Sequence, residues 1–315
     1  MSVLLDIDSS VLVILVASLA VDLIIGEWPA KIHPTVWIGN IISKISKPLP
    51  RTGSRSVICG IILALCLPTA ILISTWVLLV YLKNLNQWIY ILVSIYFLKS
   101  SFSLRLLGST SLKISNTIKS SGLERSRKDL KALVSRDPSQ LTEQQVLAAT
   151  IESVSENTSD SVIAPLLMFA IFGVAGALAY RSINTLDSMI GYRGEFELLG
   201  KGSAKLDDIV NWIPSRLSGV LIVLSSIFLP AQKFLPSLSI MLKHHKKTES
   251  PNAGWPMAAM AGALEIELTK PGHYSLGKAK HPISHNDIRN SVKSLYSSSL
   301  IFVLIISVII VSRVY

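Results

Sequence analysis

Three carboxylates in the stretch ATIESVSENTSDSVIAP have a spacing that suits chemistry. Glu152, Glu156 and Asp160 are each four residues apart, so a helix places all three side chains on one face. Like charges at that spacing repel each other unless a cation or a basic group lies between them. The pattern therefore indicates a cation site or an acid–base function. The alternative is a solvated helix face that ends where Ser159 and Asp160 cap the next helix.

A second stretch, RSINTLDSMIGYRGEF, combines an amide, a carboxylate and a guanidinium. Asn184 and Asp187 are three residues apart, so they share a helical face. The glycine-flanked turn that follows presents Tyr192 and Arg193, and a guanidinium binds phosphate or carboxylate through two parallel hydrogen bonds. An ion pair with Glu195 or Glu197 is the alternative for this arginine. The stretch thus predicts a polar helix end followed by a turn.

The third stretch, LGKGSAKLDDIVNWIPSRLSG, contains adjacent aspartates. On a helix, Asp207 and Asp208 point about 100° apart, whereas Asp207 and Asn211 share a face. Oxygen ligands of this kind suit Mg²⁺, which bridges carboxylates and phosphates. Residues 200–203 (GKGS) suggest a small backbone nest for an anion. Neither GxxxxGK[ST] nor GxGxxG occurs, so any nucleotide site differs from the P-loop and from the dinucleotide fingerprint.

The composition of the chain indicates that the helices carrying these polar side chains belong to a membrane protein. Half of the 315 residues are hydrophobic, only 16% are charged and the mean hydropathy is +0.51, whereas ordinary domains have about 25% charged residues. The apolar content and just two cysteines exclude disordered, collagenous and disulfide-scaffold proteins. A net charge of +10 is typical of cytoplasmic loops beside anionic lipid, and we expect no nucleic acid partner. The apolar blocks cover residues 11–26, 57–82, 87–107, 161–180, 217–230 and 298–312.

We therefore predict an all-α, polytopic integral membrane protein, with residues 1–315 forming a single membrane-embedded domain. Four blocks are expected to span, and 161–180 and 217–230 to form short or re-entrant helices, joined by cytoplasmic helical loops. Lys99 and Arg105 lie within an apolar block, and we expect both to snorkel to an interface.

The distribution of basic residues predicts the orientation. Residues 108–160 and 231–297 carry seven and nine Lys or Arg, so both segments are expected on the cytoplasmic side and the N-terminus outside. Residues 181–216 face outside if the two short blocks cross the bilayer, and stay cytoplasmic if both are re-entrant. We favour the cytoplasmic placement, which puts the active site on that side of the cell membrane.

Six ordered segments resemble one known family. They are IIGEWPAKIHPTVWIGN, LVSRDPSQL, IESVSENTSDSVIAP, YRSINTLDSMIGYR, KLDDIVNWIPSRL and SPNAGWPMAAMAGAL. Together they resemble the CbiB/CobD family of adenosylcobinamide-phosphate synthases over residues 22–277. The resemblance implies an integral membrane enzyme of cobalamin biosynthesis, which joins a propionate carboxyl of adenosylcobyric acid to aminopropanol or its O-phosphate. It also implies ATP as co-substrate and Mg²⁺ as cofactor.

The polar residues of this chain that match the family motifs make up the predicted site. Chemistry then suggests the roles: carboxylates hold Mg²⁺ or deprotonate the amine, and basic groups hold phosphate. The predicted metal ligands are Asp187, Asp207, Asp208 and Glu156, and the catalytic set adds Asp160. The predicted substrate-binding residues are His33, Asn157, Asn184, Tyr192, Arg193, Lys205, Asn211, Arg216 and Asn252, and Asp22 is a further matched position.

Three motif positions depart from the family pattern. The first motif usually reads Gly-Asp-Pro, whereas this chain has residues 26–29 as Gly-Glu-Trp-Pro, which keeps the charge and adds a residue. Lys205 replaces the usual arginine, so the positive charge is kept but the two parallel hydrogen bonds of a guanidinium group are lost. Ser161 replaces a glycine. All the motif carboxylates are retained.

Two other functions fit the same residues. A membrane transporter or accessory protein for a corrinoid or another anionic small molecule would use intramembrane polar residues such as Asp22 and a broken helix near the midplane. A membrane-bound phosphotransferase or synthase acting on an isoprenoid- or lipid-like substrate would also use acids and Mg²⁺. For the favoured synthase we expect membrane lipid as a partner, and a complex with other corrin-pathway enzymes.

Overall fold

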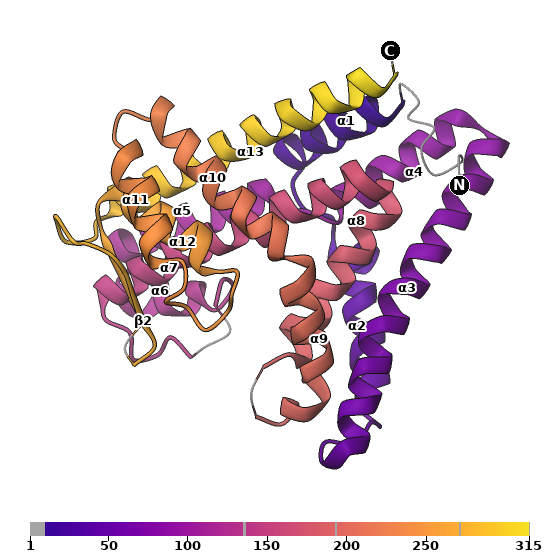
Figure 1. The fold of residues 1–315 in the computed structure, drawn as a ribbon, viewed down its shortest axis with the longest axis horizontal. Helices are drawn as coiled ribbons and strands as arrows, with labels where there is room; N and C mark the ends of the chain where they lie inside the picture. The colour runs from indigo at the N-terminus through magenta and orange to yellow at the C-terminus, as the bar shows by residue number, and fades with distance from the viewer. Residues whose placement is uncertain (1–9, 135–136, 193, 271, 315) are drawn as a thin grey trace. The chain divides into compact units, whose positions relative to one another are not determined.

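The structure is a computed structural model that describes residues 10–134, 137–192, 194–270 and 272–314. Helices account for most of the described residues, which also contain one antiparallel two-stranded sheet (Figure 1). This confirms the predicted all-α class. The chain divides into two compact units, of which the first contains Met1–Ser103, Ala164–Asn211 and Ile305–Tyr315, and the second Leu104–Ile163 and Trp212–Leu304.

In its described part, the first unit contains seven helical elements before the C-terminal helix. They are α1 (Ser10–Ile24), η2 (Ala30–Ile32), α2 (Pro34–Ser46), α3 (Gly53–Leu85), α4 (Gln87–Lys99), α8 (Ala164–Ile190) and α9 (Glu197–Val210). Side-chain caps fix two of the starts. His33 Nδ1 accepts from Thr35 N–H at the start of α2, and Asn86 Oδ1 accepts from two backbone N–H groups at the start of α4, satisfying donors that have no partner within the helix.

Close backbone contact joins α9 to the N-terminal part of α3 (Figure 1). A methyl group on Gly60 would lie 1.9 Å from the carbonyl oxygen of Leu199, and one on Gly202 would lie 2.9 Å from the backbone of Ile61. Gly200 makes an equally close approach to the end of α8. Because these glycines lie within a regular helix, the predicted anion nest at 200–203 is wrong: the GKGS sequence serves helix packing.

The second unit combines the remaining helices with the sheet. They are α5 (Leu104–Ser121), α6 (Leu123–Leu130), α7 (Glu143–Thr158), the π-helical η3 (Ser159–Ile163), α10 (Trp212–Phe228), α11 (Phe234–His244), α12 (Gly254–Leu264), β1 (Glu267–Lys270), β2 (Tyr274–Gly277) and most of α13 (His285–Val314). A capping box between Thr142 and Gln145 starts α7. The strands pair with Glu267 opposite Gly277 and Lys270 opposite Tyr274, a hairpin that we did not predict.

Among the residues that the structure describes, four helical stretches are long and apolar enough to span a membrane, in agreement with the predicted number. They are Gly53–Leu85, Gln87–Ser121, Glu143–Ile190 and His285–Ser312. The identity of the four differs from the prediction at one place. As described, α1 has 15 residues, about 22 Å of helix, and is shorter than the hydrocarbon core of about 30 Å, whereas the block 161–180 lies inside a candidate span.

Candidate functional site

The adjacent aspartates of α9 lie where helical spacing predicted them. Asn211 Nδ2 donates to Asp207 Oδ2 over 2.9 Å, and the hydroxyl of Tyr180 donates to Asn211 Oδ1 over 2.8 Å. Tyr180 and Asn211 are both buried. The amide of Asn211 is therefore held in one orientation, and it fixes the Asp207 carboxylate in turn.

Asp187 lies in the last turn of α8, near enough to Asp208 for the two negative charges to repel each other. Both side chains are half-buried. Gly191 makes room for this arrangement, because a methyl group there would lie 1.9 Å from Asp187 Oδ1. Two carboxylates from α8 and α9 are thus brought together, as a shared cation or proton would require.

The carboxylates of the first unit are suited to binding Mg²⁺ in the way that proteins usually bind it. Mg²⁺ is commonly held by one or two carboxylates, with water and substrate phosphate completing the octahedron, and the pair Asp187 and Asp208 provides two. Within the described residues, no three His, Cys, Asp or Glu side chains form a metal-binding group. The four-ligand set that also includes Asp207 and Glu156 therefore stays a prediction.

The other predicted residues of the first unit have separate environments. Asn184 Oδ1 accepts from Arg181 over 3.2 Å, and Lys205 is exposed on α9. Tyr192 is exposed and lies edge-on to Phe196 at 5.7 Å. Arg193 lies outside the described residues.

Glu195 belongs to the same turn and forms an ion pair with Arg51. Its Oε1 lies 3.6 Å from the Arg51 Nε, and the Arg51 guanidinium also lies over the ring of Phe196, 4.3 Å from its centroid. The alternative in which Glu195 pairs with Arg193 involves a residue that lies outside the described ones.

In the second unit, the acid-rich stretch continues as helix through its polar residues. Glu152 and Glu156 lie one turn apart on α7, with Glu152 buried and Glu156 half-buried. Asp160 falls in the π-helical turn of η3, so the alternative that Ser159 and Asp160 cap a new helix is wrong. A π turn takes more residues than an α turn, so Asp160 departs from a strict four-residue spacing. Such turns occur frequently at functional sites.

Asn157 is fixed by hydrogen bonds on both sides of its amide. Its Nδ2 donates to the carbonyl of Ser153 over 3.0 Å, and its Oδ1 accepts from the Ser161 hydroxyl over 2.9 Å. Ser161 is the position where the family motif usually has glycine, and here its hydroxyl bridges α7 and η3. The departure therefore adds an interaction.

Arg216 and Asn252 were predicted separately and lie together in the second unit. Arg216 Nη1 donates to Asn252 Oδ1 over 3.2 Å and to the carbonyl of Trp212 over 2.7 Å. The guanidinium also lies over the Trp212 ring, 4.2 Å from its centroid. The two motifs that contain these residues thus meet at the start of α10.

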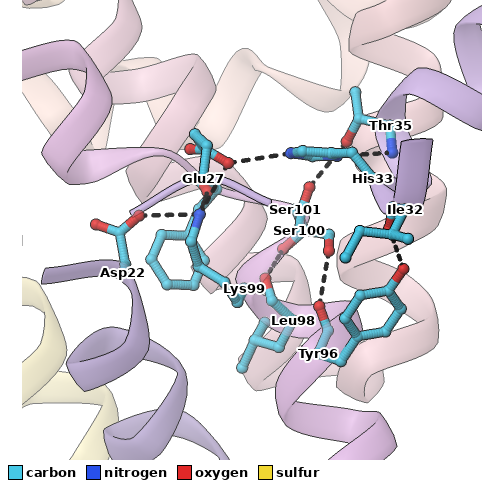
Figure 2. Close-up of polar contacts among 11 residues, drawn as sticks. Asp22, Glu27, Ile32, His33, Thr35, Tyr96, Leu98, Lys99, Ser100 and Ser101 are labelled. Carbon is cyan, nitrogen blue, oxygen red and sulfur yellow. Dashed lines mark hydrogen bonds and ion pairs between the residues drawn. The ribbon is translucent and has the colours of Figure 1, made fainter. Parts of the chain in front are cut away.

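A charged cluster that the sequence did not reveal surrounds Lys99, at the end of α4. Its Nζ lies 3.1 Å from Asp22 Oδ1 and 3.0 Å from Glu27 Oε2, and the side chain is fully buried. Figure 2 shows the ammonium group between the two carboxylates. The prediction that Lys99 snorkels to an interface is therefore wrong, because two acids supply its counter-charge inside the first unit.

His33 extends this cluster and uses both ring nitrogens within the protein (Figure 2). Its Nδ1 accepts from Thr35 N–H over 3.2 Å, so in the neutral ring the proton is on Nε2, which lies 3.0 Å from Glu27 Oε2. Burial alone would raise the pKa of Glu27, but the hydrogen bond with His33 and the charge of Lys99 outweigh it and lower that pKa.

Comparison with known proteins decides the family. A model of the CobD/Cbib protein family matches residues 15–297. The chain belongs to the CobD/Cbib family.

Relatives match over almost their whole length. The chain is 38% identical over 308 residues to the cobalamin biosynthesis protein CobD of Dehalococcoides mccartyi, covering 96% of this chain and 99% of the relative. It is also 38% identical to a probable cobalamin biosynthesis protein CobD of Methanococcus aeolicus, covering 96% of each. A third, from Methanothermobacter thermautotrophicus, is 36% identical and covers 92% of this chain and 95% of the relative. No solved structure matches the chain.

The CobD/Cbib match crosses both compact units and contains all the predicted site residues. It also contains Asp22, Glu27, His33 and Lys99. The signal that could have revealed Lys99 is the presence of two acids, Asp22 and Glu27, at the end of the first apolar block, because buried charges occur in pairs.

Proposed function

We propose that this chain is a membrane-embedded synthase of cobalamin biosynthesis that makes an amide at the expense of ATP. Its substrates would be adenosylcobyric acid and aminopropanol or its O-phosphate, and its product adenosylcobinamide or its phosphate. The observation that carries the proposal is the family match over residues 15–297, together with relatives named cobalamin biosynthesis proteins over nearly their full length.

The chemistry requires an activated carboxyl group. A propionate oxygen attacks the γ-phosphorus of ATP, releasing ADP and giving an acyl phosphate. The amine then attacks the acyl carbon, phosphate leaves, and the amine proton passes to a base. The chain must therefore balance phosphoryl charge and supply one proton acceptor.

The two groups of acids would have separate roles. Asp187 and Asp208 would hold Mg²⁺, with Asp207, oriented by Asn211, as a further ligand. The ion would supply neutralisation of phosphate charge. In the second unit, Glu156 or Asp160 would accept the amine proton.

The remaining predicted residues would bind substrate. Lys205, Arg193 and Arg216 offer cationic groups for phosphate, and Asn157, Asn184, Tyr192 and Asn252 offer hydrogen bonds to the corrinoid side chains. His33 would act by positioning its loop, since both its nitrogens already have partners in the protein. We place this chemistry at the cytoplasmic face of the cell membrane, in contact with lipid and with other corrin-pathway enzymes.

The direct test is an assay on membranes that contain the protein. Adenosylcobyric acid, ATP and Mg²⁺ are supplied with either aminopropanol or its O-phosphate, and the amide is detected by mass together with ADP. Formation of the amide in proportion to ADP supports the proposal. The amine that gives the higher rate of amide formation is the preferred substrate. Membranes that lack the protein are the control.

A transporter is the second candidate, and one observation favours it. Gly173 has a non-helical conformation (φ 67°, ψ −165°) inside the apolar helix α8, and interrupted helices commonly form transport sites. Corrinoid flux into vesicles without ATP, and without amide formation, would support this function and contradict the synthase.

A further inference from the structure

A cavity of about 360 Å³ in the second unit has a lining rich in basic and aromatic side chains. It lies where the connection from α11 to α12 meets the start of α10. Besides Arg216, its lining includes His245, Lys246, Thr248 and Trp255, none of which belongs to the predicted site. These side chains are suited to an anion that also contacts a flat aromatic surface.

Arg216 is held in place by hydrogen bonds from one nitrogen of its guanidinium group. The three hydrogen bonds of its guanidinium, to Trp212, Ser215 and Asn252, all come from Nη1. In the described structure Nη2 and Nε have no such bond, so both can donate to a ligand oxygen. The guanidinium lies 4.2 Å from the Trp212 ring centroid and 5.1 Å from that of Trp255, which fixes its plane.

The aromatic wall of the cavity is also fixed. His245 stacks on Trp255 with ring centroids 4.0 Å apart. Its Nδ1 lies 3.1 Å from the carbonyl of Met241 and 3.0 Å from that of Leu242, so this nitrogen carries a proton. The Trp255 Nε1 is buried, and within the described residues it has no hydrogen-bond acceptor, which leaves an unsatisfied donor in the wall.

Two glycines bring the three segments around the cavity into contact. A methyl group on Gly254 would lie 2.1 Å from the carbonyl oxygen of His245. One on Gly219 would lie 2.9 Å from Met241 Sδ and 3.2 Å from the Trp255 backbone. These contacts fix the backbones of α10, α11 and α12 around the cavity.

The charge balance of the lining is positive. Arg216 and Lys246 are two basic side chains in the lining, and the one acid among the described lining residues, Glu249, is hydrogen-bonded to His273 over 2.6 Å. An exposed lysine next to a fixed guanidinium is a common arrangement for holding phosphate oxygens.

We propose that this cavity binds a phosphate group of a substrate, with Arg216 and Lys246 as its cationic contacts and Trp255 as its aromatic wall. The identity of the ligand rests on the proposed function, which supplies two sources of the same chemistry: the polyphosphate of ATP and the phosphomonoester of aminopropanol O-phosphate.

The test is equilibrium binding to the purified full-length chain in detergent, in the absence of corrinoid. The probes are ATP, aminopropanol O-phosphate and inorganic pyrophosphate. We expect one of the two organic phosphates to bind and pyrophosphate to compete with it. Arg216→Lys, which keeps the charge but loses the planar guanidinium, and Lys246→Gln, which removes a charge, should each raise the Kd about tenfold. The organic phosphate that shows this change is the ligand of the cavity.

Lys243→Gln is the matched control, because Lys243 is an exposed lysine of the same basic run and does not line this cavity. Its Kd should equal that of the unmodified chain. Binding of no probe, unchanged Kd in both test variants, or equal weakening by Lys243→Gln and Lys246→Gln would overturn the proposal. If the phosphate binds as expected but no amide forms, the synthase proposal alone fails. If amide forms and the variants bind normally, the cavity proposal alone fails.

Discussion

Lys99 and Asp22 form an ion pair of 3.1 Å in which the two side chains are 0% and 1% exposed. The lysine ends one helix and the aspartate lies in the last turn of another. Removing one partner from such a pair leaves an uncompensated buried charge, which costs more than the pair contributes as a whole.

Lys99→Met should therefore destabilise the protein by about 3–5 kcal/mol. Thermal unfolding in detergent should show a lower Tm, and the double variant Asp22→Asn with Lys99→Met should recover part of the loss. Lys44→Met, at an exposed position of α2, is the control and should leave the Tm nearly unchanged. Equal effects at Lys44 and Lys99 would contradict the ion pair.

The lowered pKa of Glu27 predicts a dependence of stability on pH. Because the folded-state value lies below the ordinary 4.5, the stabilisation is complete above the unfolded-state pKa and is lost as the pH falls through the folded-state value. The thermal unfolding midpoint (Tm), measured at a series of pH values from 6 downward, should begin to fall once the pH is below about 4.5. Glu27→Gln should flatten this slope, and a slope as steep as that of the unmodified chain would exclude Glu27 as its source.

If the α8–α9 carboxylate pair holds Mg²⁺, Asp208→Asn should lower the rate of amide formation by at least about 100-fold, the scale of lost charge stabilisation in a transition state. Asn211→Ala should have a smaller effect, of about tenfold, because it only releases Asp207 from its orientation. The assay is amide formation against Mg²⁺ concentration, with insertion checked by membrane fractionation. Near-normal turnover of Asp208→Asn in inserted protein would remove the metal assignment.

Glycine contacts between helices predict a contrast between two substitutions. Gly60→Ala places a methyl group 1.9 Å from a carbonyl oxygen of α9, whereas Gly39→Ala places one 3.6 Å from Met189 Sδ, an ordinary contact. We expect Gly60→Ala to lower the Tm, and Gly39→Ala to be neutral or to raise it slightly through better helix propensity. Similar Tm values for both variants would contradict the close approach of α3 and α9.

Local geometry explains which parts of the site were predictable. The pairing of Asp207 with Asn211 follows from helical spacing alone, and the structure has it. The hydropathy pattern likewise predicted four spans, because apolar length is a property of one segment at a time. The spans differ from the prediction at one place, since α1 has only 15 residues in the described part of the chain and the block at 161–180 is continued by helix on both sides.

Features that depend on distant residues were not predictable from the sequence. Lys99 looked like a snorkelling lysine because its acids lie far away along the chain. The glycines at 200 and 202 looked like an anion nest because their packing partners are in α3 and α8. The π turn at Asp160 has no local sequence signature, and the strands of the hairpin have only four residues each.

The buried position of Lys99 also has a consequence for how the protein is made. Glu27 leaves the ribosome 72 residues before the lysine that neutralises it, and Asp22 leaves earlier still. Until α4 is synthesised, Asp22 within α1 and Glu27 shortly after it lack the charge of Lys99, and both oppose transfer of this segment into lipid. Stable integration of α1 is therefore expected to wait for α4, so that the two helices enter the bilayer as a charge-matched pair and not one after the other.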